Sequence, residues 1–428
     1  MTRILQTIYS EGIFHGLPTF PDHDGKKYTA IVTGANGISG SEMVNVLAAA
    51  PERWETIYAM SRRLPASTNP RIKNIAADFL NSTPEALATL FKEHGIKADY
   101  IFFTSYIQPP AKEGAGLWSN TDELGTANVS LLSNFLKALT LASIIPKRFL
   151  LQTGGKHYAV HLGPAEVPMT EGTTADRVDH DNFYFPQEDL LSAWASEHNT
   201  SWTVTRPGFI LGSNDNAAMN VTYGLAIYAS VQKELGRSLG FPADILAWDA
   251  SKDLSTSRLI AYHAEWAVLT KEAANQALNI VDNSPFAYGK FWPQLASWYG
   301  IRWETPEKDE GKYMTVTMPR DPPPRGFGPA GQVKFVWGFE QWAQGEEVKS
   351  AWERIQEREG LNKEFNPFRP DKIREVFGTL DADVLGPWTR TMSMDKSRKL
   401  GWHGHVQTDE AIKGVIDKMV ELKMVPRF

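Results

Sequence analysis

A glycine-rich turn between a predicted strand and a predicted helix constrains the fold of this chain more than any other feature. Ala30–Val32 is a short apolar run typical of a strand buried on both faces. Gly34, Gly37 and Gly40 follow at a spacing of three, and apolar residues then recur at helical spacing up to Leu47. Such glycines permit a tight turn, close approach of backbone to a pyrophosphate, and close packing of helix on strand. The stretch therefore predicts a dinucleotide-binding unit.

The helix that follows this turn is expected to direct free N–H groups and a partial positive charge at the phosphates. Asn36 and Ile38 belong to the turn and are predicted cofactor contacts together with the three glycines. The spacing GxxGxxG is similar to that of extended short-chain dehydrogenases. The alternative is a tight strand–helix turn that binds no ligand.

Strands alternate with helices through the next part of the chain, which predicts a Rossmann-type, doubly wound parallel sheet. Pro84 stands just inside the start of one predicted helix, a position that proline favours. The predicted strands are 30–32, 56–61, 74–79, 99–104, 148–154 and 201–206, and the predicted helices between them include 83–94 and 117–143.

The pattern changes near residue 213, so we divide the chain into three parts. These are an irregular extension over 1–27, an NADP-binding Rossmann domain over 28–212, and a smaller, mainly helical substrate-binding region over 213–428. Residues 304–332 are rich in proline, glycine and charge, which predicts a long loop or lid. Many of the 14 tryptophans follow residue 200, where we expect a pocket lined by flat rings.

The composition is that of an ordinary globular protein, with 42% hydrophobic and 22% charged residues among 428. A net charge of −6 suggests neither a nucleic-acid nor an anionic membrane partner. The absence of cysteine excludes disulfides and thiolate chemistry, and we predict no metal site. Residues 1–20 lack the apolar core of a signal peptide, and no apolar run approaches a membrane span. We therefore expect a cytoplasmic protein.

The end of the second predicted strand indicates which nucleotide is preferred. NAD-binding folds place an acidic residue there to hold the ribose hydroxyls. This chain has Ser61, Arg62 and Arg63 instead, and a guanidinium can pair with a 2′-phosphate. The sequence thus predicts NADP(H), although a solvated surface arginine pair is the alternative. Asp78 and Phe79, at the end of the third predicted strand, suit the amine and the ring face of an adenine.

The Tyr-x-x-x-Lys pair of ordinary short-chain dehydrogenases is not found in the expected region, because Tyr184 is followed four residues later by Glu188. Lys156 instead stands just beyond the fifth predicted strand, where a catalytic group is expected in a parallel sheet. We therefore select Lys156 and Tyr184 as the candidate catalytic pair. Further candidate cofactor contacts lie at or beyond strand ends, and these are Thr104, Pro207 and Ile210.

At these residues the sequence resembles the progesterone 5β-reductase/iridoid synthase-like (PRISE) family, an atypical branch of the extended short-chain dehydrogenases. The resemblance spans nearly the whole chain. It includes the glycine turn, Ser61–Arg63, Thr153–Tyr158, Asn182–Tyr184, Glu188–Asp189, Arg206–Gly208, Met219–Asn220, the Trp248 region, Asn279–Val281, Lys396–Ser397, Gly401 and Val425–Pro426. The resemblance implies NADPH-dependent reduction of the C=C bond of enones and enals, with Lys156 and Tyr184 as the family's lysine and tyrosine. The family's second tyrosine is Phe185 here, and 305–345 has no counterpart.

We therefore predict an NADPH-dependent reductase that adds hydride to the C=C bond of a small, apolar, terpenoid- or steroid-like enone or enal. Tyr184 would donate a hydrogen bond to the substrate carbonyl, where charge develops in the reaction. A carbonyl reductase or an epimerase that uses the same residues is the second hypothesis. A non-catalytic NADP-sensing regulator is the third. The partner is a small-molecule substrate, and a homodimer is left open.

Overall fold

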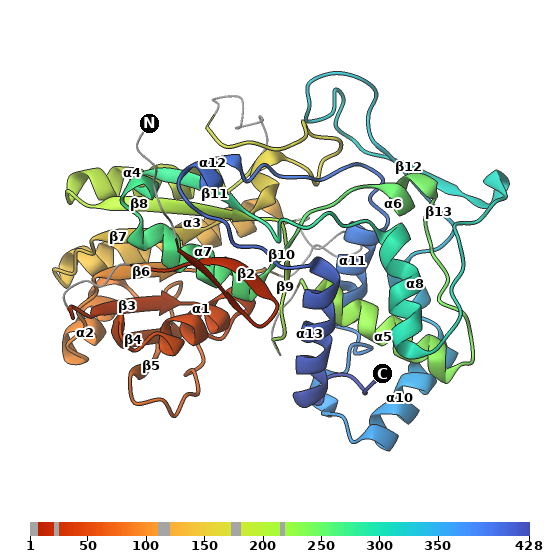
Figure 1. Cartoon of the computed structure of the whole chain (residues 1–428), viewed down its shortest axis with the longest axis horizontal. Helices are drawn as coiled ribbons and strands as arrows, with labels where there is room; N and C mark the ends of the chain where they lie inside the picture. The colour runs from red at the N-terminus through yellow and green to blue at the C-terminus, as the bar shows by residue number, and fades with distance from the viewer. Residues whose placement is uncertain (1–6, 21–24, 110–119, 173–180, 215–218) are drawn as a thin grey trace.

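A seven-stranded parallel sheet forms one side of the molecule, in a computed structural model that describes residues 7–20, 25–109, 120–172, 181–214 and 219–428. Figure 1 shows this sheet and its helices on the left and a mainly helical part on the right. In spatial order the strands are β11 (Gln276–Ile280), β8 (Ser201–Pro207), β7 (Arg148–Gln152), β6 (Tyr100–Phe103), β3 (Tyr28–Thr33), β4 (Trp54–Ser61) and β5 (Ile72–Ala76).

Helices cover both faces of the sheet, as the near-continuous apolar strands predict. On β3, Ala30 and Val32 point into the core under one helical layer, whereas Ile31 points into the core on the other face. One layer consists of α1 (Ile38–Ala49) and α7 (Ser257–Leu269), and the other of α2 (Pro84–Glu93), α3 (Thr121–Leu141) and α4 (Tyr184–Glu197). The predicted doubly wound α/β fold is therefore confirmed.

The chain reverses its direction across the sheet at β3. It first adds β4 and β5 on one side of β3, and it then returns to place β6 on the other side. In such sheets the ligand crevice lies outside the carboxyl ends of the strands at this reversal. The glycine turn follows β3 directly, so it lies at that point.

The boundary that we drew at residue 212 differs from the observed arrangement. Helix α7 packs in the same core layer as α1, and β11 pairs in parallel with β8 at the edge of the sheet. Residues 257–280 therefore return to the sheet after the chain has entered the helical part. Local periodicity carries no information about which sheet a strand joins, so this return could not be predicted from it.

The helical part surrounds α5 (Val221–Glu234), whose residues from Val221 to Gln232 are all buried. A helix buried on every side forms the centre of a core rather than its surface. The other helices of this part are α6 (Ile245–Asp249), α8 (Tyr288–Tyr299), α9 (Phe339–Trp342), α10 (Glu346–Glu359), α11 (Ile373–Val384) and α13 (Thr408–Glu421), with a small parallel pair of strands, β9 (Phe209–Leu211) and β10 (Leu254–Thr256). Helix α12 (Asp395–Lys399) instead lies against β11 at the edge of the sheet, where Lys396 donates to the carbonyl of Ala277 at 2.9 Å. None of the described helices combines the length and apolarity needed to span a bilayer.

Three boundaries differ from the sequence predictions. The N-terminal extension, expected to be irregular, contains an antiparallel hairpin of β1 (Ile8–Glu11) and β2 (Phe14–Pro18). The third predicted strand ends at Ala76, because Asp78 turns the chain. The helix predicted from residue 117 begins at Thr121, and 117–119 lie outside the described residues.

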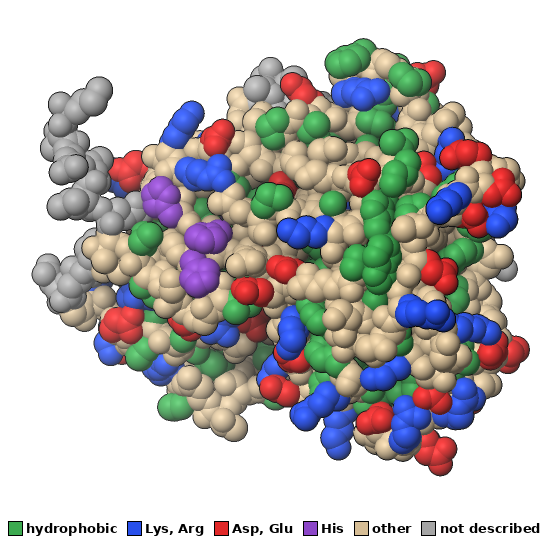
Figure 2. Space-filling model, turned by 45° about the vertical axis from the view of Figure 1, so that its right-hand side comes forward, with side chains coloured by type: hydrophobic (Ala, Val, Ile, Leu, Met, Phe, Trp, Pro, Cys, Tyr) green, Lys and Arg blue, Asp and Glu red, His purple; other side chains and the backbone are tan. Residues whose placement is uncertain are grey.

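The Pro-rich segment is a hairpin extension rather than a plain loop. Strand β12 (Met314–Thr317) pairs antiparallel with β13 (Gln332–Phe335), and residues 318–331 form the tip. The tip contacts the segment that follows Lys156, because the Arg325 amide donates to the carbonyl of Pro164 at 3.1 Å. Apolar side chains remain exposed on the hairpin, namely Met314 and Val316 in β12 and Phe327 in the tip. Figure 2 shows hydrophobic side chains gathered along this side of the molecule.

Candidate active site

The glycine turn has the geometry that a bound pyrophosphate requires. Gly34 has a φ of +66°, and a Cβ added to it would lie 2.9 Å from the carbonyl oxygen of Thr104. A Cβ on Gly40 would lie 2.1 Å from the carbonyl oxygen of Gly34, so no side chain fits there either. Helix α1 starts after Gly37 without a side-chain cap, which leaves its first turn suited to an anionic ligand.

Side chains around the turn fix its position against both neighbouring segments. The Asn36 amide donates to the carbonyl of Arg63 at 2.7 Å, and the Asn214 amide donates to the carbonyl of Asn36 at 2.7 Å. Ile38 fills the space over Gly212, where an added Cβ would lie 2.6 Å from it. The turn is therefore tied to the end of β4, where Arg62 and Arg63 are exposed to solvent.

The residues after β5 are arranged for turn formation. Both the Leu80 and the Asn81 amides donate to Asp78 Oδ1 at 3.0 Å. Burial raises the pKa of Asp78, but hydrogen bonds from Asn81 and the nearby charge of Arg62 outweigh it, so the pKa is lowered. The Phe79 ring is 3% exposed and lies 4.9 Å from Phe135, so it belongs to the core. Any contact of residue 79 with an adenine would therefore come from its backbone.

Three further predicted contacts lie at the same edge of the sheet. The Thr104 hydroxyl donates to the carbonyl of Thr33 at 2.7 Å and so joins β6 to β3 beside the glycine turn. Pro207 ends β8 with its side chain buried, and Ile210 lies half-buried in β9. These positions lie where a doubly wound sheet is expected to bind its ligand, at the strand reversal.

Tyr184 and Lys156 meet at the end of β7. A Cβ added to Gly154 would lie 3.1 Å from the Tyr184 hydroxyl oxygen, so this hydroxyl lies directly beside the strand end, two residues before Lys156. The Asn182 amide donates to the carbonyl of Lys156 at 3.0 Å, and Asn182 Oδ1 accepts from the Tyr184 amide at 3.1 Å. Asn182 thus joins the two candidate residues. Our sequence reasoning gave it no role, although it stands in the motif Asn182–Tyr184.

Phe185 points in a different direction from Tyr184. Its ring packs edge-on against His157 with 5.0 Å between the ring centroids. The Tyr184 ring instead packs against Phe183 at 4.6 Å and carries its hydroxyl to Gly154. A hydroxyl added at residue 185 would therefore not occupy the place of the Tyr184 hydroxyl.

Glu188 stands four residues after Tyr184, where ordinary short-chain dehydrogenases have a lysine. Its contacts hold the elements around the site together. Its carboxylate accepts from Arg206 at 3.1 and 3.3 Å, and His157 Nδ1 lies 3.4 Å away. The Tyr158 hydroxyl donates to Asn279 at 2.7 Å and lies 3.4 Å from Arg206. This buried network connects α4, β8, β11 and the segment of Lys156.

Burial dominates the titration of the two candidate residues. It raises the pKa of the Tyr184 hydroxyl well above its ordinary value, which keeps the phenol protonated at neutral pH. It also lowers the pKa of the Lys156 ammonium well below the usual range. Across the described residues, no group of three or more His, Asp or Glu side chains is arranged to hold a metal ion.

The fold and the glycine turn define a Rossmann-type protein of the short-chain dehydrogenase class. Residues 30–317 match the PRISE-like Rossmann-fold domain, and the chain belongs to this family. It is 30% identical over 406 residues to the short chain dehydrogenase gsfE of Penicillium aethiopicum, a match that covers 93% of this chain and 99% of that protein. It is 28% identical over 414 residues to the (S)-8-oxocitronellyl enol synthase ISY1 of Nepeta racemosa, with 93% of each chain covered.

Solved structures show the same fold at much lower identity. The UDP-glucose 4-epimerase of Thermotoga maritima superposes with a TM-score of 0.55 and 14% identity, and the match covers 92% of this chain and 99% of that one. The predicted resemblance to the PRISE family is confirmed. The roles of the individual site residues rest on the geometry above.

We predict that Glu188→Gln lowers the free energy of unfolding by about 3–5 kcal/mol at neutral pH, because it leaves the buried Arg206 guanidinium without its counter-charge. Burial raises the pKa of Glu188, but His157 and Arg206 outweigh it and lower the pKa. A lowered carboxyl pKa stabilises the fold above the unfolded-state value of 4.5, and this contribution is lost as the pH falls through the folded value. Urea unfolding at several pH values measures both effects.

The matched control is Glu197→Gln, since Glu197 is an exposed glutamate on the same helix. It should change stability very little. An equal loss in both variants, or a loss in Glu188→Gln that persists unchanged in acid, would contradict the role given to the ion pair.

Proposed function

We propose that this protein is an NADPH-dependent reductase that adds hydride to the C=C bond of an enone or enal in a small apolar molecule. The observation that carries the proposal is the position of the Tyr184 hydroxyl beside Gly154, at the carboxyl end of β7 and in the segment that leads to Lys156. A neutral phenol at this edge of the sheet is a hydrogen-bond donor aimed where a substrate carbonyl would lie.

The chemistry needs one donor at the substrate carbonyl oxygen. NADPH, held by the glycine turn and by Lys156, would supply a hydride for the β-carbon of the substrate. Negative charge then moves to the carbonyl oxygen as an enolate, and the Tyr184 hydroxyl stabilises it through a hydrogen bond. One such donor contributes up to about 2.7–4 kcal/mol to the rate of comparable steps. Because the enolate can take its proton from solvent afterwards, Tyr184 need not become a phenolate.

The chain offers residues suited to each part of the cofactor. The glycine turn and the start of α1 would hold the pyrophosphate, and Arg62 would pair with the 2′-phosphate. Lys156 would hold the nicotinamide ribose hydroxyls, and Asn182 keeps its backbone in place. An anionic cofactor beside Lys156 would raise its pKa again, because a nearby negative charge favours the ammonium form.

The surroundings of Lys156 support an apolar substrate. A Cβ on Gly155 would lie 3.8 Å from Met392 Sδ, an apolar side chain beside the segment of Lys156. The name of the Nepeta relative describes formation of an enol, which is the product that hydride addition to an enal creates once its oxygen is protonated. The apolar contact supports an apolar substrate, and the name of the relative supports C=C reduction over reduction of a ketone.

The cofactor preference is tested with Arg62→Ala. We expect the wild type to bind NADPH more tightly than NADH, because the exposed guanidinium pairs with the 2′-phosphate. Loss of this charge-assisted contact should weaken NADPH binding by about 1.5–3 kcal/mol and leave NADH binding unchanged. Lys92→Ala, at an exposed cation on α2, is the control. Calorimetric titration that gives equal affinities for both nucleotides in the wild type would refute the assignment.

The mechanism is tested with Tyr184→Phe. We expect kcat for an enone or enal to fall by about 10²–10³ without reaching zero, because hydride donor and substrate remain in position. Carbonyl reduction should suffer more, since an alkoxide needs its proton in or near the same step. Oxidation of NADPH, monitored with a panel of enones and ketones, measures both.

The control for this experiment is Phe185→Tyr. Phe185 packs against His157 rather than Gly154, so a new hydroxyl there should not rescue Tyr184→Phe. Rescue, or full activity in Tyr184→Phe alone, would show that the donor is another residue. NADPH binding without turnover of any enone or ketone by the wild type would indicate a nucleotide-sensing role instead.

The hairpin of β12 and β13 is proposed to border the substrate site. Its tip touches the segment after Lys156, since a Cβ on Gly163 would lie 3.4 Å from Pro324. Deletion of residues 322–330 leaves the hydrogen bond from the Met318 amide to the Gly331 carbonyl, at 2.8 Å, to close the shortened hairpin. We expect altered kcat and KM with nearly unchanged NADPH affinity. Identical kinetics on every substrate would show that the tip is only a surface insertion.

A further inference from the structure

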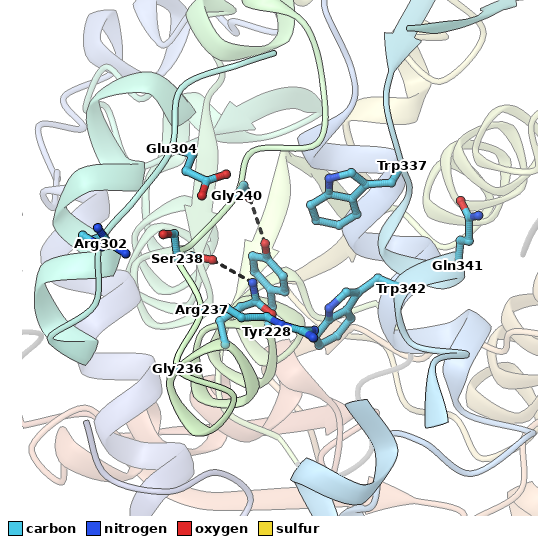
Figure 3. A pocket seen from close by; sticks show the side chains of 11 residues that line it. Tyr228, Gly236, Arg237, Ser238, Gly240, Arg302, Glu304, Trp337, Gln341 and Trp342 are labelled. Atoms are coloured by element: carbon cyan, nitrogen blue, oxygen red, sulfur yellow. Dashed lines mark hydrogen bonds between the residues drawn. The ribbon is translucent and has the colours of Figure 1, made fainter. Parts of the chain in front are cut away.

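A pocket of about 650 Å³ opens in the helical part of the molecule, and its lining residues all differ from those around Lys156 and Tyr184. Its floor comes from α5. Its two sides come from the segments 236–240 and 302–304, and from the segment 337–342 around α9. Figure 3 shows the Trp337 and Trp342 rings on one side, the chain through Gly240 on the other, and Tyr228 between them. This is the ring-lined pocket expected after residue 200.

The pocket is held open by hydrogen bonds within the protein. The Tyr228 hydroxyl donates to the carbonyl of Gly240 at 2.9 Å, and the Gln232 amide donates to the carbonyl of Ser238 at 2.7 Å. The Glu304 amide donates to the carbonyl of Leu239 at 3.0 Å. The floor of the pocket and one of its sides are therefore fixed to each other before any ligand binds. This lowers the conformational entropy that binding would cost.

Aromatic rings form the other side. The Tyr228 ring is 1% exposed, and its centroid lies 5.7 Å from that of Trp337 and 5.0 Å from that of Trp342. Both indoles are half-buried, so each keeps part of its surface for a ligand. The faces of such rings carry negative electrostatic potential, and indole is the best of them at attracting a cation.

The space beside Gly240 shows which charge the pocket prefers. A Cβ built there would lie 3.6 Å from a Glu304 carboxylate oxygen, 3.6 Å from the Tyr228 hydroxyl oxygen and 3.9 Å from a ring carbon of Trp337. The Tyr228 proton is already donated to Gly240, so its oxygen presents lone pairs. A carboxylate, a phenol oxygen and an indole thus meet around one point, and each of them attracts a positive charge.

Two arginines, Arg237 and Arg302, also line the pocket, but neither supplies any of the three atoms nearest to this point beside Gly240. The Glu304 carboxylate is exposed to solvent, and within the part of the chain that the structure describes it makes no hydrogen bond or ion pair. Arg237, which also lines the pocket, is paired with Glu347 at 2.7 Å. In Figure 3 Glu304 lies beside Gly240 with Trp337 across the pocket, and Arg302 lies on the side of Glu304 that faces away from Trp337.

We propose that this pocket binds a small organic cation, an amine or quaternary ammonium group on a compact apolar body. The ammonium would lie beside Gly240 against Glu304 and Trp337, and the apolar body would lie along Trp342. The site is independent of the reaction proposed above, because it uses no residue of the nicotinamide side.

The test is isothermal titration calorimetry of the full chain with choline and with 3,3-dimethylbutan-1-ol, its neutral isostere. We expect choline to bind at least about tenfold more tightly than the alcohol, because only the cation gains from the carboxylate and the indoles. Equal affinities for the two compounds would overturn the proposal, and so would a lack of binding by both choline and butylamine.

Variants locate the site. Glu304→Gln should weaken choline binding about tenfold or more, and Gly240→Leu should abolish it by filling the space. Glu310→Gln, at an exposed glutamate of the same segment, should have no effect. An added Cβ at Gly240 makes only ordinary van der Waals contacts, so Gly240→Ala should fold normally. This variant replaces Gly240→Leu in the test if the leucine variant has a lowered melting temperature. Choline affinity that is unchanged in both Glu304→Gln and Gly240→Ala would place the cation elsewhere and refute the site.

Discussion

The ion pair between Glu188 and Arg206 is the interaction on which the candidate site depends. Glu188 lies one helical turn after Tyr184, and Arg206 lies at the end of β8, so the pair fixes α4 against the sheet. His157 joins the same carboxylate from the segment that carries Lys156. A buried pair is costly to desolvate and still costlier to break. The position of the tyrosine relative to the lysine is therefore set by charge pairing across three segments.

The glycine turn supplies the second constraint, and the two constraints meet at one edge of the sheet. Gly34 contacts the backbone after β6, and the Gln152 amide at the end of β7 donates to the Ser39 hydroxyl at 2.8 Å. The start of α1 is thereby tied to the strand that leads to Lys156. A nucleotide bound along this edge would extend from the exposed Arg62 to the half-buried Tyr184. The order of the strands brings motifs that are distant in the sequence to one edge of the sheet, where they form one elongated site.

Much of this arrangement was predictable from sequence, because the fold and the site use strong local signals. Strand, glycines and helix at Gly34–Gly40 predicted the nucleotide crevice, and the strand ends predicted where Lys156 would lie. The hairpin of β12 and β13 was missed because each strand has only four residues, so the alternation of apolar and polar residues in each is too short to stand out from the Pro- and Gly-rich sequence around it. The return of 257–280 to the sheet was missed for another reason. Strand order is a tertiary property, and periodicity along the chain does not encode it.

The separation of lysine and tyrosine onto different segments has a chemical consequence. Where both stand on one helix turn, the ammonium lies beside the phenol and favours its ionisation. Here the fourth residue after Tyr184 is a glutamate committed to Arg206, and burial raises the pKa of the Tyr184 hydroxyl. A protonated phenol serves poorly as a base but well as a donor to a developing enolate. This arrangement is consistent with the proposed reaction, which needs stabilisation of an oxyanion more than transfer of a proton.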